Sequence, residues 1–170
     1  MKKKLLAPIL GLSFLLTGCF GKPHAQLSSR IDQISSNEPQ AIHLESDGIF
    51  EGMESVWGEK GAEVQVKTPG TYLVIWAPQV ALVTDEKRGC FVSWLQVNNK
   101  NVPDSGVKIC LPPGPETTQV LVGQYAGDFE IGDTLRPMMT GFNTKTKFYP
   151  EDGVRRRVDI PSVIFTVVKL

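Results

Sequence analysis

The chain has 170 residues, of which 41% are hydrophobic and 21% are charged. This composition is ordinary for one globular domain and excludes disorder of the whole chain. Cleavage of a signal peptide would remove three lysines from the 18 basic residues, leaving 15 against 18 acidic residues and a net charge of −3. A mildly acidic domain is a poor nucleic-acid binder, because phosphate neutralisation needs clustered lysine and arginine.

The first 19 residues have the parts of a bacterial lipoprotein signal. Lysines at positions 2–4 form a positive n-region, and the apolar stretch from Leu5 to Leu16 is shorter than the roughly 20 residues that span a bilayer. The sequence Leu-Thr-Gly-Cys that ends at Cys19 matches the lipobox of lipoprotein precursors. We therefore predict a signal peptide over 1–18 and acyl chains, including palmitate, on Cys19. The alternative is an ordinary secretory signal with an incidental cysteine.

The position after the cysteine bears on which membrane holds the protein. Many lipoproteins retained in the inner membrane carry aspartate there, whereas this chain has Phe20. Several acyl chains give stable anchoring, because each buried CH₂ contributes roughly 0.8 kcal/mol. The predicted location is the outer membrane, lipid-anchored, with the rest of the chain facing the periplasm or the cell surface.

Residues 19–43 are predicted to be the lipidated N-terminus and a flexible tether, because the stretch is polar and contains two prolines. Leu27, Ile31 and Ile34 have the spacing of a short coiled-coil seam. A single frayed helical turn is preferred, because isolated helices below roughly 12–15 residues are marginal. The folded domain is then predicted to cover residues 44–170.

Beyond residue 44 the pattern is typical of β-strands. Short runs with period-two alternation or continuous apolar character are separated by turn signals, which favours an all-β sandwich or barrel. The clearest predicted strands are 62–66, 72–77, 91–97, 118–125, 134–140 and 163–168.

Two of these strands, 72–77 and 163–168, are apolar on both faces. A strand of a two-layer sandwich normally has one solvent-exposed face. The outer apolar face of these two strands therefore needs to be covered by a loop, another sheet or a neighbouring subunit. Candidate partner-binding residues on these strands are Tyr72, Val74, Ile75 and Ile164.

The cysteines suggest one disulfide. With Cys19 taken by lipid, Cys90 and Cys110 remain as an even pair in an oxidising compartment. Their bond would close a loop of about 21 residues, which contributes roughly 3 kcal/mol in the chain-entropy model. The alternative is two free buried thiols. Zinc is not expected, because His24 and His43 both fall in the predicted tether.

The order of several motifs resembles the globular heads of the complement first-component and tumour necrosis factor families. The strand from Gly70 to Trp76 resembles the G-x-Y-x-φ strand of these heads, Cys90 and Cys110 follow with the spacing of the complement-head bridge, and the Gly132-Asp133 turn precedes a further strand. The stretch 162–168 is similar to the closing strand, although Thr166 stands where the family prefers glycine, and no collagen-like repeat precedes the domain. The resemblance covers about residues 48–170. It implies a jelly-roll-like antiparallel β-sandwich that forms trimers, binds ligands through loops and carries no catalytic residues.

No catalytic or metal site is predicted. A serine or cysteine nucleophile needs an adjacent base, and both histidines lie in the predicted tether. Asp128 and Asp133 lack the spacing of a calcium loop. No cofactor is expected.

Surface residues offer two further hypotheses. Arg155, Arg156 and Arg157 could contact an acidic partner, although a solvated loop is the simpler interpretation. Among the tryptophans, which could stack on sugars, Trp57 is the one expected to be exposed.

The sequence therefore favours a non-catalytic outer-membrane lipoprotein that acts as a binding or assembly module. The first hypothesis is a subunit of a cell-envelope complex such as a secretion-system core, with the membrane and other envelope proteins as partners. The second is a self-standing trimeric ligand binder or adhesin. The third is a periplasmic inhibitor of a cell-wall hydrolase, for which the proline-rich stretch 112–115 is the candidate loop.

Overall fold

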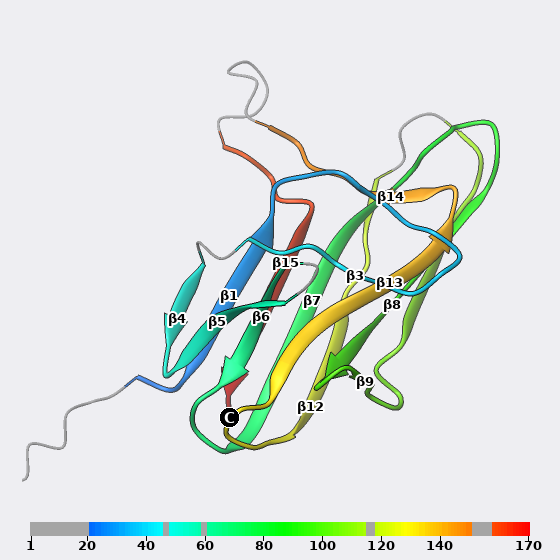
Figure 1. Cartoon of the computed structure of the whole chain (residues 1–170). Helices are drawn as coiled ribbons and strands as arrows, with labels where there is room; N and C mark the ends of the chain where they lie inside the picture. Colours follow the sequence, from blue (N-terminus) through cyan, green and yellow to red (C-terminus); the bar gives the residue numbers. More distant parts are fainter. Residues whose placement is uncertain (1–20, 46–47, 59–60, 115–117, 151–157) are drawn as a thin grey trace, which may run out of the picture.

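The computed structural model describes residues 21–45, 48–58, 61–114, 118–150 and 158–170. Over these residues the chain forms two facing sheets of antiparallel strands (Figure 1). Within the same ranges there is no helix long and apolar enough to cross a membrane. The predicted all-β sandwich is confirmed.

The first sheet is centred on the long strand β7 (Gly70–Leu82). Its strand order is β2-β14-β7-β15-β1-β4. Strands β11 and β12 also pair with β7. The bounds of its other strands are β1 (His24–Ser29), β2 (Gln33–Ile34), β4 (Ile49–Glu51), β11 (Gln119–Val120), β12 (Gly123–Phe129), β14 (Thr144–Thr146) and β15 (Val163–Lys169).

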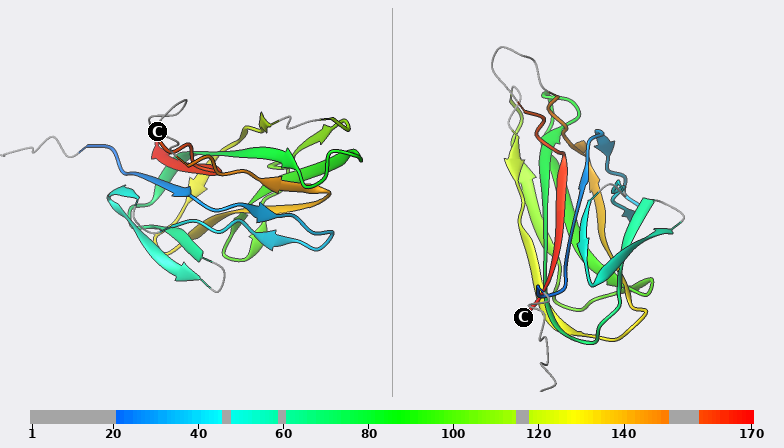
Figure 2. Two further views of the ribbon diagram at one scale, coloured as in Figure 1. Left: turned by 90° about the horizontal axis from the view of Figure 1, so that it is seen from above. Right: turned by 90° about the vertical axis from the view of Figure 1, so that its left-hand side faces the viewer.

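The second sheet has the order β10-β8-β13-β6-β5, with β9 beside β8 and β3 beside β13. The chain crosses between the sheets from β6 to β7 to β8, and again from β12 to β13 to β14 (Figure 2). The bounds are β3 (Gln40–Ala41), β5 (Met53–Gly58), β6 (Gly61–Val66), β8 (Gly89–Val97), β9 (Lys100–Asn101), β10 (Val107–Leu111) and β13 (Thr134–Phe142).

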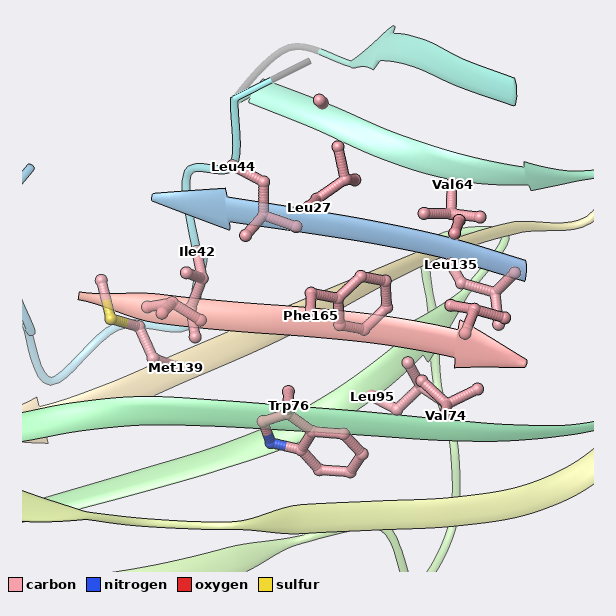
Figure 3. Close-up of a cluster of buried hydrophobic side chains, with 14 of the residues drawn as sticks. Leu27, Ile42, Leu44, Val64, Val74, Trp76, Leu95, Leu135, Met139 and Phe165 are labelled. Atoms are coloured by element: carbon pink, nitrogen blue, oxygen red, sulfur yellow. The ribbon is translucent and has the colours of Figure 1, made fainter. Parts of the chain in front are cut away.

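The core lies between the sheets and is filled by alternate residues of each strand. Strand β7 follows this rule closely, because Tyr72, Val74 and Trp76 are all fully buried. Side chains from both sheets meet around Trp76 and Phe165 (Figure 3). The alternation of residues 62–66 and the continuous apolar run 72–77 therefore both predicted strands correctly.

One predicted strand is interrupted. The run 118–125 divides into β11 and β12, and the N–H of Leu121 between them donates to the carbonyl oxygen of Pro78 at 3.0 Å. Beyond the break, Gly123 lies against the indole of Trp76, and a Cβ there would fall 2.1 Å from a ring atom. Glycine at this position lets the bulky tryptophan occupy the core.

The tether predicted over residues 19–43 is wrong from His24 onward. Strand β1 lies inside the first sheet, paired with β15 on one side and with β4 on the other, and Ala25, Leu27 and Ser29 are fully buried. Neither a coiled-coil seam nor a helical turn forms there. The folded unit therefore begins about 20 residues before the predicted boundary at residue 44, because β15 takes β1 as its partner.

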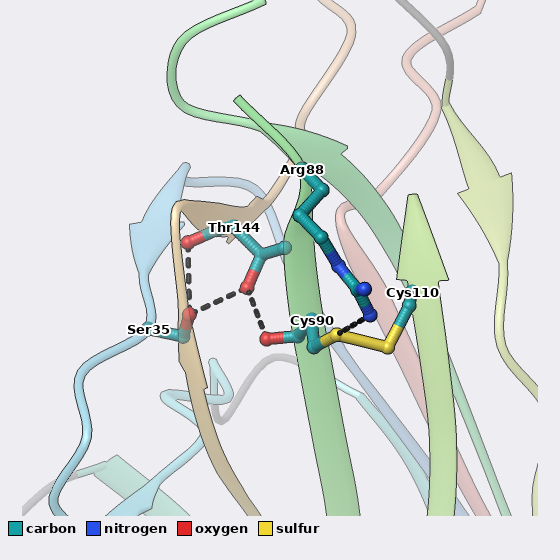
Figure 4. Close-up of a disulfide and its surroundings, with 5 residues drawn as sticks. All are labelled: Ser35, Arg88, Cys90, Cys110 and Thr144. Carbon is teal, nitrogen blue, oxygen red and sulfur yellow. Dashed lines mark hydrogen bonds between the residues drawn. A yellow bond between two sulfur atoms is a disulfide. The ribbon is translucent and has the colours of Figure 1, made fainter. Parts of the chain in front are cut away.

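The predicted disulfide between Cys90 and Cys110 is present and joins neighbouring strands (Figure 4). The two residues are directly opposite in the β8–β10 pair, with Cα atoms 4.1 Å apart. Next to it, the hydroxyl of Thr144 donates to the carbonyl oxygen of Cys90 at 3.2 Å, and the hydroxyl of Ser35 donates to the carbonyl oxygen of Thr144 at 2.9 Å. Like the inward-facing residues of β1, Ser35 belongs to the folded domain although it falls in the predicted tether.

Candidate functional site

The residues proposed to bind a partner divide between the two faces of the first sheet. Tyr72 and Val74 point into the core and are fully buried, so their prediction as partner-binding residues is wrong. Burial raises the pKa of the Tyr72 phenol, whose hydroxyl donates to the carbonyl oxygen of Thr68. Ile75 and Ile164 lie on the opposite, outer face, and the Ile164 residue is 36% exposed.

The outer face of β7 and β15 carries an aliphatic strip. In the register of this pair, Leu73 is opposite Val168, Ile75 is opposite Thr166, and Ala77 is opposite Ile164. Directly opposed side chains lie on the same face of a sheet and contact each other. We call Leu73, Ile75, Ala77, Ile164 and Val168 the aliphatic strip; all are half-buried or exposed. The expectation that these strands are apolar on both faces is therefore correct.

A shallow, largely apolar groove of about 490 Å³ adjoins the strip. It runs across β4, β1 and β15, with the exposed Ile49 on its far side. Polar side chains border it, and the ring of His24 lies 3.7 Å from a carboxylate oxygen of Glu51. The lining residues are Lys22, His24, Ala25, Gln26, Ile49, Thr166 and Val168. Together the groove and the strip extend over four strands.

The chain enters the domain beside its C-terminus. The N–H of Lys169 donates to the carbonyl oxygen of Pro23 at 2.8 Å, and His24 is opposite Val168 in the sheet. From Cys19 to His24 the chain makes five residue steps, which reach at most about 18 Å when fully extended. The groove therefore lies at the end of the domain nearest to the predicted lipid anchor.

The remaining candidate residues divide between described and undescribed parts of the chain. Cys19, the signal peptide and Arg155, Arg156 and Arg157 lie outside the described residues. Asp128 accepts a hydrogen bond from Thr71, and Asp133 accepts bonds from the Asn98 amide and the N–H of Glu130. In the described part of the chain, no three histidine, cysteine or acidic side chains are grouped to hold a metal ion.

Sequence reasoning missed an ionic cluster around Asp32, which falls in the predicted tether. Its carboxylate lies 2.9 Å from the Lys145 ammonium and 3.6 Å from that of Lys147, and it accepts the N–H of Phe148. Burial by itself would raise the pKa of Asp32, but these hydrogen bonds and positive charges outweigh it and lower the pKa below 3.8. The two lysines also line a cavity of about 180 Å³ with Tyr149.

This cluster predicts a pH dependence of stability. Because the folded pKa of Asp32 is lowered, its contribution is fully present above the unfolded value of 3.8 and is lost as the pH falls through the folded pKa. Asp32→Asn should lower the free energy of unfolding at about pH 7. Below about pH 4, where carboxylates usually titrate, the free energy of unfolding of the variant should fall less steeply with decreasing pH than that of the parent. Urea unfolding of the parent and the variant at several pH values measures this. If the free energies of unfolding of the parent and the variant differ by the same amount at every pH down to about 2, this prediction is wrong.

Comparison of the chain with protein-family models and with curated proteins found no match. Of the residues predicted to bind a partner and described by the structure, the two that face outward, Ile75 and Ile164, both belong to the aliphatic strip.

Proposed function

We propose that this protein is a non-catalytic lipoprotein of the outer membrane that works as an assembly module, a subunit of a larger cell-envelope complex. The observation that carries the proposal is the aliphatic strip, a row of outward-facing apolar side chains on the central strands of the first sheet. Monomeric soluble proteins rarely leave large apolar patches uncovered, and such patches mark interaction sites. The strip is proposed to bind another envelope protein.

The short connection to Cys19 supports a partner close to the membrane. With only five residue steps before β1, the domain cannot reach far from an anchor at Cys19. A module held in this way suits a complex built at the membrane surface better than an adhesin that must extend outward. The lipobox, Leu16-Thr17-Gly18-Cys19, supports the anchor itself.

The anchor can be tested separately. Cys19→Ser should leave an unprocessed precursor that incorporates no labelled palmitate, because the diacylglyceryl group is attached to the sulfur atom of Cys19. Cys90→Ser with Cys110→Ser provides a control, since these cysteines are joined to each other and should not affect labelling. Normal palmitate incorporation into the Cys19→Ser chain would refute the anchor.

The proposed interface is tested by placing a charge on the strip. Ile164→Asp should abolish co-purification of the partner after gentle detergent extraction and crosslinking. An unpaired buried charge costs several kcal/mol, which corresponds to a loss in affinity of at least about a hundredfold. Ile131→Asp is the matched control, because Ile131 is 66% exposed and lies outside the strands. Circular dichroism should show both variants folded, since each new carboxylate can reach water.

The identity of the crosslinked partner separates the hypotheses. Crosslinks from the strip to a different envelope protein support the proposal. Crosslinks only between copies of this chain would replace it with the trimeric binder that the family resemblance implies. Equal recovery of partner with Ile164→Asp and with the parent would show that the strip is not the interface.

A further inference from the structure

A second groove lies on the other sheet, where β13 changes partners. Strand β13 pairs with β6 at Thr134 and Leu135, then with β3 at Met138 and Met139. The groove has a volume of about 540 Å³, with Arg136 and Met138 on one side and Trp57 on the β5–β6 hairpin. It is remote in the fold from the aliphatic strip, so the two surfaces can be tested independently.

Arg136 is held rigidly in this groove. Its Nε and Nη2 both donate to Oε1 of Gln96, at 3.0 and 2.9 Å, and Nη2 also donates to Oδ1 of Asn99 at 2.6 Å. Its Nη1 donates to Oε1 of Glu63 at 2.7 Å. The row continues through Asn101, whose Oδ1 accepts hydrogen bonds from Gln96 and Trp94. The guanidinium is therefore fixed before any ligand arrives.

The charge of this site is balanced. The side chains of Arg136 and Glu63 are only 18% and 12% exposed, and they form a direct ion pair. An ion pair largely removed from water adds little to stability, because desolvation offsets the attraction. With its charge neutralised by Glu63, Arg136 presents hydrogen-bonding atoms without a strong field for anions.

Two neighbouring residues of β5 shape the opening. A Cβ on Gly58 would lie 2.3 Å from Oε1 of Glu63, the same oxygen that binds Arg136, so glycine is needed for the pair to form as it does. Trp57 precedes it and is 69% exposed. An indole left in water beside a fixed row of planar polar groups offers a ligand one apolar face and several hydrogen bonds.

We propose that this groove binds a pyranose unit of a saccharide chain, with the sugar stacked on Trp57 and its hydroxyls bonded to the side chains of Arg136, Glu63 and Asn99. A sugar ring has an apolar face of C–H groups and a rim of hydroxyls, which matches this combination. An anion is disfavoured because Glu63 cancels the charge of Arg136. An apolar peptide side chain is disfavoured because Glu63, Asn99 and Arg136 all line the groove and would lose water without gaining a partner.

The test is calorimetric titration of the full chain, purified in detergent, with chitotetraose, cellotetraose, maltotetraose and the glycan fragments of digested peptidoglycan. At least one of these should bind, and Trp57→Ala should weaken that binding about tenfold or more. Trp57→Phe should retain part of it. Asn99→Gly should weaken binding while keeping the turn, because the φ angle of Asn99 is 63°, which glycine adopts freely. Phe142→Ala is the control, since Phe142 is an exposed aromatic at the other end of β13.

Each outcome decides the proposal. Saccharide binding that is lost with Trp57→Ala and kept with Phe142→Ala supports it, and the saccharide that binds identifies the source of the glycan. Binding of none of the four preparations overturns it. Binding that Trp57→Ala leaves unchanged also overturns it, as does displacement of the saccharide by inorganic phosphate, which would indicate an anion site.

Discussion

A chain that begins at residue 44 is expected to be unfolded, whereas one that begins at residue 21 is expected to fold. The first lacks β1, whose loss exposes the edge of β15 and empties the core positions of Ala25 and Leu27. Removing Leu27 alone as Leu27→Ala should cost about 2–5 kcal/mol. A domain stability of about 5–15 kcal/mol would not survive the loss of the whole strand.

Circular dichroism and urea unfolding of the two truncated chains measure this effect. Gln26→Ala is a matched control on the same strand, because Gln26 points outward and is exposed. A cooperative unfolding transition in the chain that begins at residue 44 would show that β1 is dispensable. The domain would then start where the sequence alone placed it.

Replacing Trp76 by alanine should give the largest loss of stability from a single substitution, about 3–5 kcal/mol. Trp76 is among the largest fully buried side chains, and Gly123 cannot fill the space left by its indole. Trp57→Ala is the matched control. Because Trp57 is 69% exposed, that change should stay within about 0.5 kcal/mol. Chemical denaturation measures both, and similar losses for the two variants would contradict the assignment of Trp76 to the core.

Local patterns predicted the strands that carry many apolar residues, and they failed for β1. Strand β7 could be predicted because six consecutive apolar residues lie between turn signals. Strand β1 reads His-Ala-Gln-Leu-Ser-Ser, with two apolar residues that face inward. Its position is set by pairing with β15, about 140 residues later in the chain. No local pattern reports such a distant partner.

The candidate sites show the same limit. Period two indicates that Tyr72 and Val74 share one face of β7 and that Ile75 lies on the other, but it does not say which face is covered. The prediction therefore mixed core residues with outward ones. The Arg136–Glu63 pair joins residues 73 positions apart, and only the β6–β13 register brings them together.

The central claim is that the aliphatic strip binds another envelope protein, and site-specific photo-crosslinking in intact cells tests it most directly. A photoreactive amino acid at Ile164 should yield one crosslinked product that contains a different envelope protein, identified by mass spectrometry. The same amino acid at Lys108, exposed on the opposite sheet, should yield none. Absence of a product at Ile164, or the same products from both positions, would contradict the account.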